Sequence, residues 1–358
     1  MDKKVMVAMS GGVDSSVTAA ILNDKGYDVI GATMKIVPDY IDDRRNQEGS
    51  CCAIEDAKRV AAELDIPHYV FNVKKTFQKK VIDYFVEEYR AGKTPNPCIV
   101  CNKKIKFSLL LGKAKEIDCD YIATGHYARI NKDSDLDRHL LYKALDKDKD
   151  QSYMLYNLSQ KQLKQILFPL GNFHKSKVRK VAQKFALPVY DKPDSQEICF
   201  VPDDDYTNFL EKYYSDLGKT GPIYYVDGRK IGEHQGLYNY TIGQRRGLGI
   251  SLDHPVYVIE INNEANSLVV GPRKELKFSG LIAKKVNWLA FSQKPENLEA
   301  EVKIRYNANP AKAYISDQGE GKVRVEFAEP MEAVAPGQSA VFYDDDLILG
   351  GGVISSSF

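Results

Sequence analysis

The sequence predicts an α/β protein with a Rossmann-like parallel sheet, a small central domain and a C-terminal antiparallel β-barrel. Between residue 1 and about residue 130, short apolar runs alternate with helical stretches, which is typical of a parallel sheet covered on both faces. From about residue 200 the chain becomes rich in Gly and Tyr, and after about residue 275 short alternating runs dominate, as in small barrels. The expected domains are therefore 1–200, 201–275 and 276–358.

The elements of the first domain are expected in an alternating order. Strands are predicted at residues 5–9, 27–36, 66–73 and 121–125, and helices at 14–25, 52–64, 77–90 and 103–117. Residues 131–150 are polar and highly charged, so an exposed hairpin or loop is expected there. Further along, a helix is expected to start at Pro202 to Asp205. Barrel strands are predicted at 301–306, 322–327, 340–343 and 350–354.

Composition narrows the classes of protein that fit. The 358 residues carry a formal net charge of +1, and 43% are hydrophobic. This balance excludes a disordered or collagen-like chain. Apolar runs stay well below the roughly 20 residues of a membrane helix, and the first residues do not resemble a signal peptide. We therefore expect a cytoplasmic protein with no membrane partner, whose six cysteines are reactive, metal-binding or buried rather than disulfide-bonded.

The sharpest local signal is the loop Ser10-Gly11-Gly12-Val13-Asp14-Ser15-Ser16, between a strand and a helix. Glycines allow a ligand to approach the backbone, a helix N-terminus offers N–H donors, and hydroxyls add further donors, which together suit a polyphosphate. The loop lacks the Gly-Lys-Ser/Thr ending of a Walker A loop, so an enzyme that cleaves the γ-phosphate is not favoured. Asp14 would either orient the loop or help to place Mg²⁺.

This loop resembles the pyrophosphate-binding loop of the ATP pyrophosphatase (PP-loop) superfamily. The resemblance implies an adenine nucleotide hydrolase type of fold that cleaves ATP between the α and β phosphates and leaves an adenylated substrate. The residues that it implies for the nucleotide are Ala8, Met9, Ser10, Gly11, Gly12, Val13, Asp14, Ser15, Met34 and Gly125.

An adenylated substrate needs a nucleophile, and two cysteine segments are candidates. They are Thr94 to Lys103, with Cys98 and Cys101, and Ser195 to Phe200, with Cys199. The lysines that follow Cys101 (Lys103, Lys104 and Lys106) are expected to lower a thiol pKa. Residues 74–115 hold 11 Lys+Arg and three Asp+Glu, a local net charge of +8 that would suit RNA. The other cysteines, Cys51, Cys52 and Cys119, are expected to be buried or incidental.

Six motifs, in order, make the chain similar to the bacterial tRNA-specific 2-thiouridylase family (MnmA/TrmU) over essentially its whole length. They are Ser10–Ser16, Thr94–Phe107, Thr124–Tyr127, Lys149–Tyr153, Ser195–Cys199 and Thr241–Gly249. The resemblance implies that ATP and Mg²⁺ adenylate O2 of the wobble uridine, U34, in a tRNA anticodon stem-loop. It also implies that a sulfur-relay donor protein loads a persulfide on Cys199, or that free sulfide is used. Cys101 would be the nucleophile that attacks the persulfide, either releasing sulfide or closing a disulfide with Cys199 that must then be reduced.

The same resemblance implies contacts to the target base and to tRNA. Asn96, Pro97 and Cys98 would face the base, and the tRNA contacts would be His126, Lys149, Asp150, Gln151, Arg305, Tyr306 and Gln338. Arg245 and Arg246 are further candidates. For His126, which would contact RNA or phosphate, a structural histidine is nearly as good an explanation.

One position departs from the family, which commonly has Asp where this chain has Cys98. Cys98, Cys101 and Cys199 would then be three thiolates for a [4Fe–4S] cluster with one open iron, or for zinc with a fourth ligand. A redox Cys-x-x-Cys pair, a persulfide relay without a cluster and a silent substitution are the other interpretations.

Two other functions fit parts of the pattern. An amide-forming ligase of the same superfamily would need neither Cys101 nor Cys199. A non-catalytic ATP- or RNA-binding module is the third hypothesis, and the intact loop argues against it.

Overall fold

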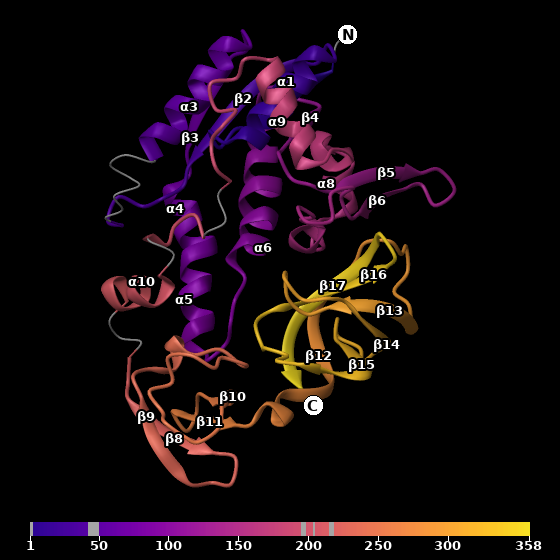
Figure 1. The fold of residues 1–358 in the computed structure, drawn as a ribbon. Helices are drawn as coiled ribbons and strands as arrows, with labels where there is room; N and C mark the ends of the chain where they lie inside the picture. The colour runs from indigo at the N-terminus through magenta and orange to yellow at the C-terminus, as the bar shows by residue number, and fades with distance from the viewer. Residues whose placement is uncertain (1–2, 42–49, 195–197, 203–204, 215–217) are drawn as a thin grey trace. The chain divides into compact units, whose positions relative to one another are not determined.

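The computed structural model describes residues 3–41, 50–194, 198–202, 205–214 and 218–358 (Figure 1). The chain forms two compact units, and it crosses between them several times. The first unit comprises Met1–Val81, Cys98–Asp204 and Asp346–Ile348, and the second Ile82–Pro97, Asp205–Asp345 and Leu349–Phe358. The division into three domains expected from the sequence stays a prediction.

The first unit is built on a five-stranded parallel sheet, which confirms the predicted Rossmann-like class. Its strands lie in the order β3-β2-β1-β4-β7, and all neighbours are parallel. They are β1 Lys4–Ala8, β2 Asp28–Lys35, β3 His68–Asn72, β4 Tyr121–Ala123 and β7 Ile166–Leu167. The centre of β1, Val5 to Val7, is fully buried, because a parallel sheet of this kind is covered on both faces and its central strands are apolar throughout.

Helices cover this sheet, and α1 and α9 pack against each other (Figure 1). Apolar side chains of α1, α3 and α9 share one core with the strands. The helices of the unit are α1 Val13–Asp24, α3 Ser50–Glu63, α4 Lys74–Phe77, α6 Pro97–Cys101, α7 Leu111–Glu116, α8 Gln160–Leu163 and α9 Lys175–Lys184. Short 3₁₀ turns occupy Ser152–Leu155 and Pro169–Asn172.

Two helices predicted from the sequence contain π-helical stretches. Gln78–Ile82 connects α4 to α5 (Asp83–Arg90), and Asn102–Leu110 connects α6 to α7. The wider i→i+5 turn changes which side chains share a helix face, and π segments are frequent at functional sites. The second of these helices begins at Pro97, since proline fits the first position of a helix.

The polar stretch 131–150 contributes to a hairpin, as expected. Its strands are β5 Arg129–Asp133 and β6 Arg138–Tyr142. Tyr142 also pairs with Leu347 near the end of the chain, so a late segment completes the first unit.

The second unit contains a small sheet that the sequence did not reveal. Its order is β10-β11-β8-β9, from β8 Gly221–Tyr225, β9 Lys230–His234, β10 Tyr257–Asn262 and β11 Ser267–Gly271. The helix expected near Asp205 is α10 Tyr206–Tyr213, and the Asp205 side chain caps it by accepting a hydrogen bond from the Asn208 N–H. 3₁₀ turns lie at Leu237–Asn239 and Arg273–Leu276.

The C-terminal part of this unit is a closed six-stranded antiparallel barrel, as predicted (Figure 1). The strands follow the order β12-β15-β14-β13-β16-β17, and β12 pairs with β17 to close the ring. They are β12 Lys277–Trp288, β13 Asn297–Lys303, β14 Ala311–Asp317, β15 Val323–Glu332, β16 Ser339–Asp344 and β17 Leu347–Ser357. Closure leaves the barrel without a free edge between its first and last strands.

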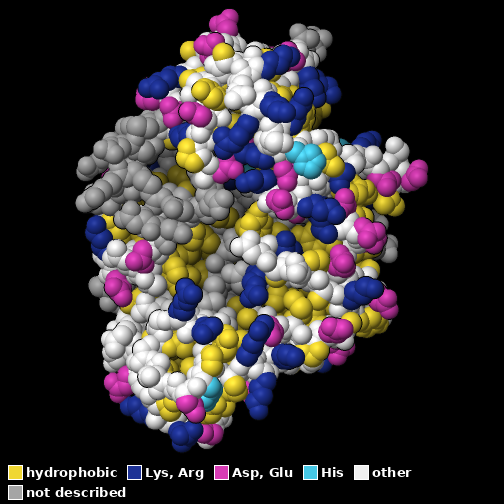
Figure 2. Space-filling model, viewed as in Figure 1, with side chains coloured by type: hydrophobic (Ala, Val, Ile, Leu, Met, Phe, Trp, Pro, Cys, Tyr) yellow, Lys and Arg dark blue, Asp and Glu magenta, His cyan; other side chains and the backbone are white. Residues whose placement is uncertain are grey.

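Within the described residues, no helix is both long enough and apolar enough to cross a membrane. On the face that Figure 2 shows, Lys and Arg side chains are interspersed with Asp and Glu, in line with the formal net charge of +1.

Candidate active site

The glycine-rich loop turns from β1 into α1. Gly11 has a φ of +73°, and a Cβ there would lie 2.3 Å from the carbonyl oxygen of Ala53, so the turn requires glycine. Gly12 is the N-cap of α1 and supplies no side-chain hydrogen bond. The first N–H groups of α1 therefore have no side-chain cap, which suits an anionic ligand.

The serines of the loop divide into two roles. The Ser15 hydroxyl donates to the Gly12 carbonyl at 3.1 Å and accepts from the Ser10 N–H at 3.1 Å. The Ser16 hydroxyl donates to the same carbonyl at 2.9 Å. Both side chains are buried, so they hold the loop in shape, whereas Ser10 is exposed and is the one available to a ligand.

The structure brings Gly125 next to this loop. A Cβ on Gly125 would lie 2.8 Å from the carbonyl carbon of Asp14 and 2.9 Å from the Ser15 nitrogen, so the chain after β4 passes directly over the start of α1. The Met9 N–H donates to Ala32 at 2.8 Å, which ties the end of β1 to β2. Met34 is half-buried at the carboxyl end of β2, the edge where open α/β sheets bind ligands.

Asp14 is held by two groups that are distant in sequence. The Tyr127 hydroxyl donates to Asp14 Oδ1 at 2.8 Å, and Lys175 Nζ lies 2.7 and 2.8 Å from the two carboxylate oxygens. Burial and the Asp14 charge raise the pKa of Tyr127, so the phenol remains a donor. These contacts favour the loop-orienting role of Asp14, since both of its oxygens are already engaged.

A second lysine braces the other end of the loop. Lys192 Nζ donates to the Gly11 carbonyl at 3.1 Å and to Asp56 Oδ2 at 2.8 Å. Sequence reasoning missed Lys175 and Lys192, because neither lysine stands in a recognised motif. Of the residues that hold the loop, Tyr127 was the one that a motif, Thr124–Tyr127, could have indicated.

Three free thiols gather in the same unit. Cys98 and Cys101 lie in α6, and Cys199 lies in the segment after residue 197. Cys98 and Cys199 are exposed and Cys101 is buried. Cys199 interacts electrostatically with both other thiols, although about a hundred residues of chain separate it from them. Residues 195–197 of the Ser195–Cys199 motif lie outside the described residues.

The expected lowering of the thiol pKa values is wrong in its net direction. Burial raises the pKa of Cys98 and of Cys101. It also raises the pKa of Cys199, and the neighbouring thiols raise it further. Cys98 and Cys199 keep accessible surface, but the protein around each sulfur removes enough bulk water for burial to dominate. Of the three lysines named from the sequence, Lys106 opposes this effect at all three thiols.

The described structure gives no support to the [4Fe–4S] or zinc interpretation of the three thiols. Among the residues that the structure describes, no group of three or more His, Cys, Asp or Glu side chains is placed to hold a metal ion. Cys119 is buried and free, and burial raises its pKa, as expected for an incidental thiol. The side chains of Cys51 and Cys52 lie outside the described residues.

His126 is buried, with both ring nitrogens engaged. Its Nδ1 lies 2.7 Å from the Thr124 hydroxyl, and its Nε2 lies 3.5 Å from Lys106 Nζ. The ring also contacts Phe107 and Phe168. Burial, with the Lys106 charge, keeps its pKa well below the usual value, so the imidazole is neutral. The geometry favours the structural role for His126 over direct contact with RNA.

Residues 149–151, expected to touch tRNA, are tied into the first unit. Lys149 Nζ lies 2.8 Å from Asp194 Oδ2. The Asp150 carboxylate accepts from the Ala144 N–H at 2.9 Å and from the Ser152 hydroxyl at 2.8 Å. Gln151 Oε1 accepts from the Tyr127 N–H at 3.0 Å. The hydrogen bonds of Asp150 and Gln151 therefore hold this segment in shape. Lys149 is the residue of the three that carries a positive charge for tRNA phosphates.

The remaining expected contacts, apart from Cys98, belong to the second unit, whose segment Ile82–Pro97 ends at the first residue of α6. Asn96 is half-buried and Pro97 is buried at the start of α6. Arg305 is exposed, and the neighbouring Tyr306 ring lies 5.6 Å from Lys303 Nζ. Gln338 donates from Nε2 to the Thr94 carbonyl at 2.9 Å, which fixes the chain just before Asn96.

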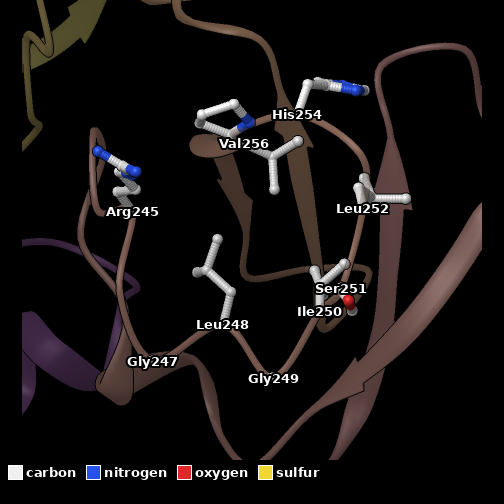
Figure 3. Close-up of a pocket in the computed structure, with 10 residues that line it drawn as sticks. Arg245, Gly247, Leu248, Gly249, Ile250, Ser251, Leu252, His254 and Val256 are labelled. Carbon is white, nitrogen blue, oxygen red and sulfur yellow. The ribbon is translucent and has the colours of Figure 1, made fainter.

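A cavity of about 420 Å³ lies in the second unit, beside the Thr241–Gly249 motif. Figure 3 shows Arg245 at its rim and the apolar side chains of Leu248 and Val256 within it. Arg245 and Arg246, the further candidate contacts to tRNA, are both exposed.

Three family models cover nearly the whole chain. They are a tRNA methyl transferase HUP domain at residues 3–203, a tRNA methyl transferase PRC-barrel domain at 207–272 and an aminomethyltransferase β-barrel domain at 278–354. The parallel sheet, the small second sheet and the closed barrel fall in these three ranges in that order. Fold and matches together define a class of tRNA-modifying proteins.

Individual relatives define the family within that class. The chain is 52% identical to a tRNA-specific 2-thiouridylase MnmA of Halothermothrix orenii, over 99% of both chains. It is 51% identical to that of Carboxydothermus hydrogenoformans, over 98% of this chain and 97% of the relative. With that of Clostridioides difficile the identity is 49%, over 100% and 99%. The chain belongs to the MnmA family of tRNA-specific 2-thiouridylases.

Proposed function

We propose that this protein is a tRNA-uridine 2-sulfurtransferase, which uses ATP to convert the wobble uridine of tRNA into 2-thiouridine. The observation that carries the proposal is that Cys98, Cys101 and Cys199 lie within electrostatic range of one another in the unit that holds the phosphate loop. An activation site and a sulfur site in one compact unit are what such a reaction needs. The names of relatives about half identical over the full chain support the same substrate.

The first step is activation of the base. The pyrophosphate part of ATP binds the loop from Ser10 to Ser15, and the adenosine lies toward Met34 and Gly125. Uridine O2 attacks the α-phosphate, and pyrophosphate leaves. The carbonyl oxygen, a poor leaving group, becomes part of AMP. Mg²⁺ would take phosphate oxygens as ligands. Asp14, engaged by Tyr127 and Lys175, orients the loop.

The second step transfers sulfur. A donor protein, or free sulfide with an oxidant, loads a persulfide on exposed Cys199. The terminal sulfur bonds to C2, and the C2–O bond to AMP breaks. The Cys101 thiolate then attacks Cys199 Sγ and breaks the S–S bond that holds the transferred sulfur, so 2-thiouridine leaves and a Cys101–Cys199 disulfide forms. A thiol reductant restores both thiols, which fits a reducing, cytoplasmic location. No step is routed through a metal cluster.

The remaining parts have assigned roles in this proposal. Residues 1–200 form the catalytic domain, 201–275 a central tRNA-binding domain and 276–358 a barrel that grips the anticodon stem. Lys149, Arg305 and Tyr306 bind tRNA, and residues 96–98 face the base, which must be turned out of its stack at a cost of a few kcal/mol.

The test is analysis of tRNA digests for 2-thiouridine after incubation with ATP, Mg²⁺, a persulfide donor and a reductant. Cys101→Ala and Cys199→Ala should each abolish the product, whereas Cys119→Ala, the matched control, should retain it. Full thiolation by either of the first two variants would refute the assigned roles. Amide formation without thiolation would indicate a ligase, and binding of ATP and tRNA without turnover a non-catalytic module.

A further inference from the structure

The phosphate loop is joined to the segment 149–151 by a chain of ion pairs. Lys175 Nζ lies 2.7 Å from Asp14 and also 2.7 Å from Asp194 Oδ1. Lys149 Nζ lies 2.8 Å from the other carboxylate oxygen of Asp194, Oδ2. Asp194 is therefore the link between the cation on the loop and the cation expected to touch tRNA.

A second connection reaches the same segment through Tyr127. Its hydroxyl donates to Asp14 at 2.8 Å. Its backbone forms two hydrogen bonds with Gln151, from the Tyr127 N–H to the Gln151 side chain at 3.0 Å and from the Gln151 N–H to the Tyr127 carbonyl at 2.9 Å. One carboxylate on the loop thus constrains both ends of the segment from Lys149 to Gln151.

The side chains in this network are partly buried, so solvent and salt screen their ion pairs less than they screen exposed ones. The Lys175 and Asp194 side chains are 12% and 22% exposed. Burial would raise the pKa of Asp194, but hydrogen bonds from Lys149 and Lys175 outweigh it and lower the pKa, so the carboxylate stays ionised. Arg179 adds a third cation at 3.2 Å, and the Lys175 N–H donates to Asp146 at 2.8 Å. Ion pairs of this kind are screened less than exposed ones.

We propose that Asp194 is a positioning residue that couples polyphosphate binding at the loop to tRNA binding at Lys149. The proposal rests on the proposed function, which supplies the two ligands. A ligand on the loop fixes Asp14, and through Lys175–Asp194 and Tyr127–Gln151 it fixes the segment that receives tRNA. The second ligand then has less ordering to impose, so each ligand tightens the binding of the other by the same factor.

The experiment measures this factor at equilibrium. α,β-Methylene ATP with Mg²⁺ is titrated into the full-length protein with and without a saturating unmodified tRNA transcript that carries a wobble uridine. The non-cleavable analogue prevents turnover. We expect tRNA to tighten analogue binding by about 5-fold or more, the lower end of common allosteric couplings. Asp194→Asn should bring the factor close to one, Asp194→Glu should restore part of it, and Asp191→Asn, an exposed aspartate three residues earlier, should leave it unchanged.

The outcomes separate this inference from the proposed function. If native protein binds both ligands with a factor of one, or if tRNA weakens the analogue, the coupling is refuted while the proposed function stands. Full coupling in Asp194→Asn refutes the role of Asp194. Failure of native protein to bind either ligand refutes the proposed function instead. If Asp194→Asn does not fold, Tyr127→Phe, which removes one hydroxyl from the second connection, must lower the factor for the inference to survive.

Discussion

Lys106 Nζ lies 3.5 Å from Nε2 of the buried, neutral imidazole of His126. A neutral imidazole accepts a hydrogen bond from an ammonium, so His126 holds a positive charge in place. That charge lowers the pKa of Cys98, Cys101 and Cys199, against the larger effect of burial.

Replacement of Lys106 by Met should therefore make the thiols less reactive. The thiol pKa values lie above the usual range, so the thiolate fraction rises with pH, about tenfold per unit below the pKa. The variant should shift the alkylation profile of Cys98 and Cys199 to higher pH and slow alkylation at pH 8 by about 3- to 10-fold. Iodoacetamide labelling followed by mass spectrometry measures this. The control is Lys104→Met, an exposed lysine on the same helical segment; an equal shift there would contradict the specific role of Lys106.

Gly125→Ala should destabilise the protein and weaken ATP binding. The new Cβ would lie 2.8 Å from backbone at the start of α1, which forces the loop to move at a cost of about 1–3 kcal/mol. Gly112→Ala is a matched control, because its Cβ meets nothing within 4 Å and alanine is favoured in a helix by about 1 kcal/mol. Thermal unfolding should show opposite shifts in Tm. Equal shifts would mean that Gly125 is not sterically required.

Cys98→Asp should retain thiolation within about threefold, because the proposed relay uses Cys101 and Cys199. Anaerobically reconstituted native protein should contain no stoichiometric iron and no thiolate–iron band near ~400 nm. Loss of activity together with loss of such a band would instead establish a cluster.

Arg305→Gln should weaken tRNA binding and reduce the slope of log affinity against log salt by about 1, as expected when one phosphate contact is lost. Arg305 is exposed and lies between β13 and β14 of the barrel. Lys277→Gln, another exposed cation at the start of β12, should leave the slope unchanged. A change of affinity at constant slope would show that Arg305 does not contact a phosphate.

The sequence predicted the parts of the fold where local pattern and burial agree. The run Val5 to Met9 is apolar throughout because β1 is covered on both faces. The second sheet was missed because β8 and β9 are five-residue strands, each with one buried side chain, and their Gly and Pro read as turns. The π-helical stretch Asn102–Leu110 was predicted as plain helix, since no residue pattern separates the two.

The site was predictable where a motif carries it and not where distant residues meet. Gly11 and Gly125 stand in motifs, and the structure brings them together. Lys175 and Asp14 are 161 residues apart in sequence, and a charged residue alone does not indicate its partner. The thiol pKa values are raised, whereas the nearby lysines predict that they are lowered. The lysines are visible in the sequence, but burial, which has the larger effect, is a property of the whole fold.

The pairing of Tyr142 with Leu347 has a consequence for synthesis. The first unit includes residues 346–348, so these residues must be synthesised before that unit gains its last strand contact. While the barrel is being translated, the edge of β6 at Tyr142 has not yet paired with Leu347. Unpaired strand edges favour pairing with other chains. Truncation before residue 346 would therefore damage the unit that begins the chain as well as the barrel that ends it.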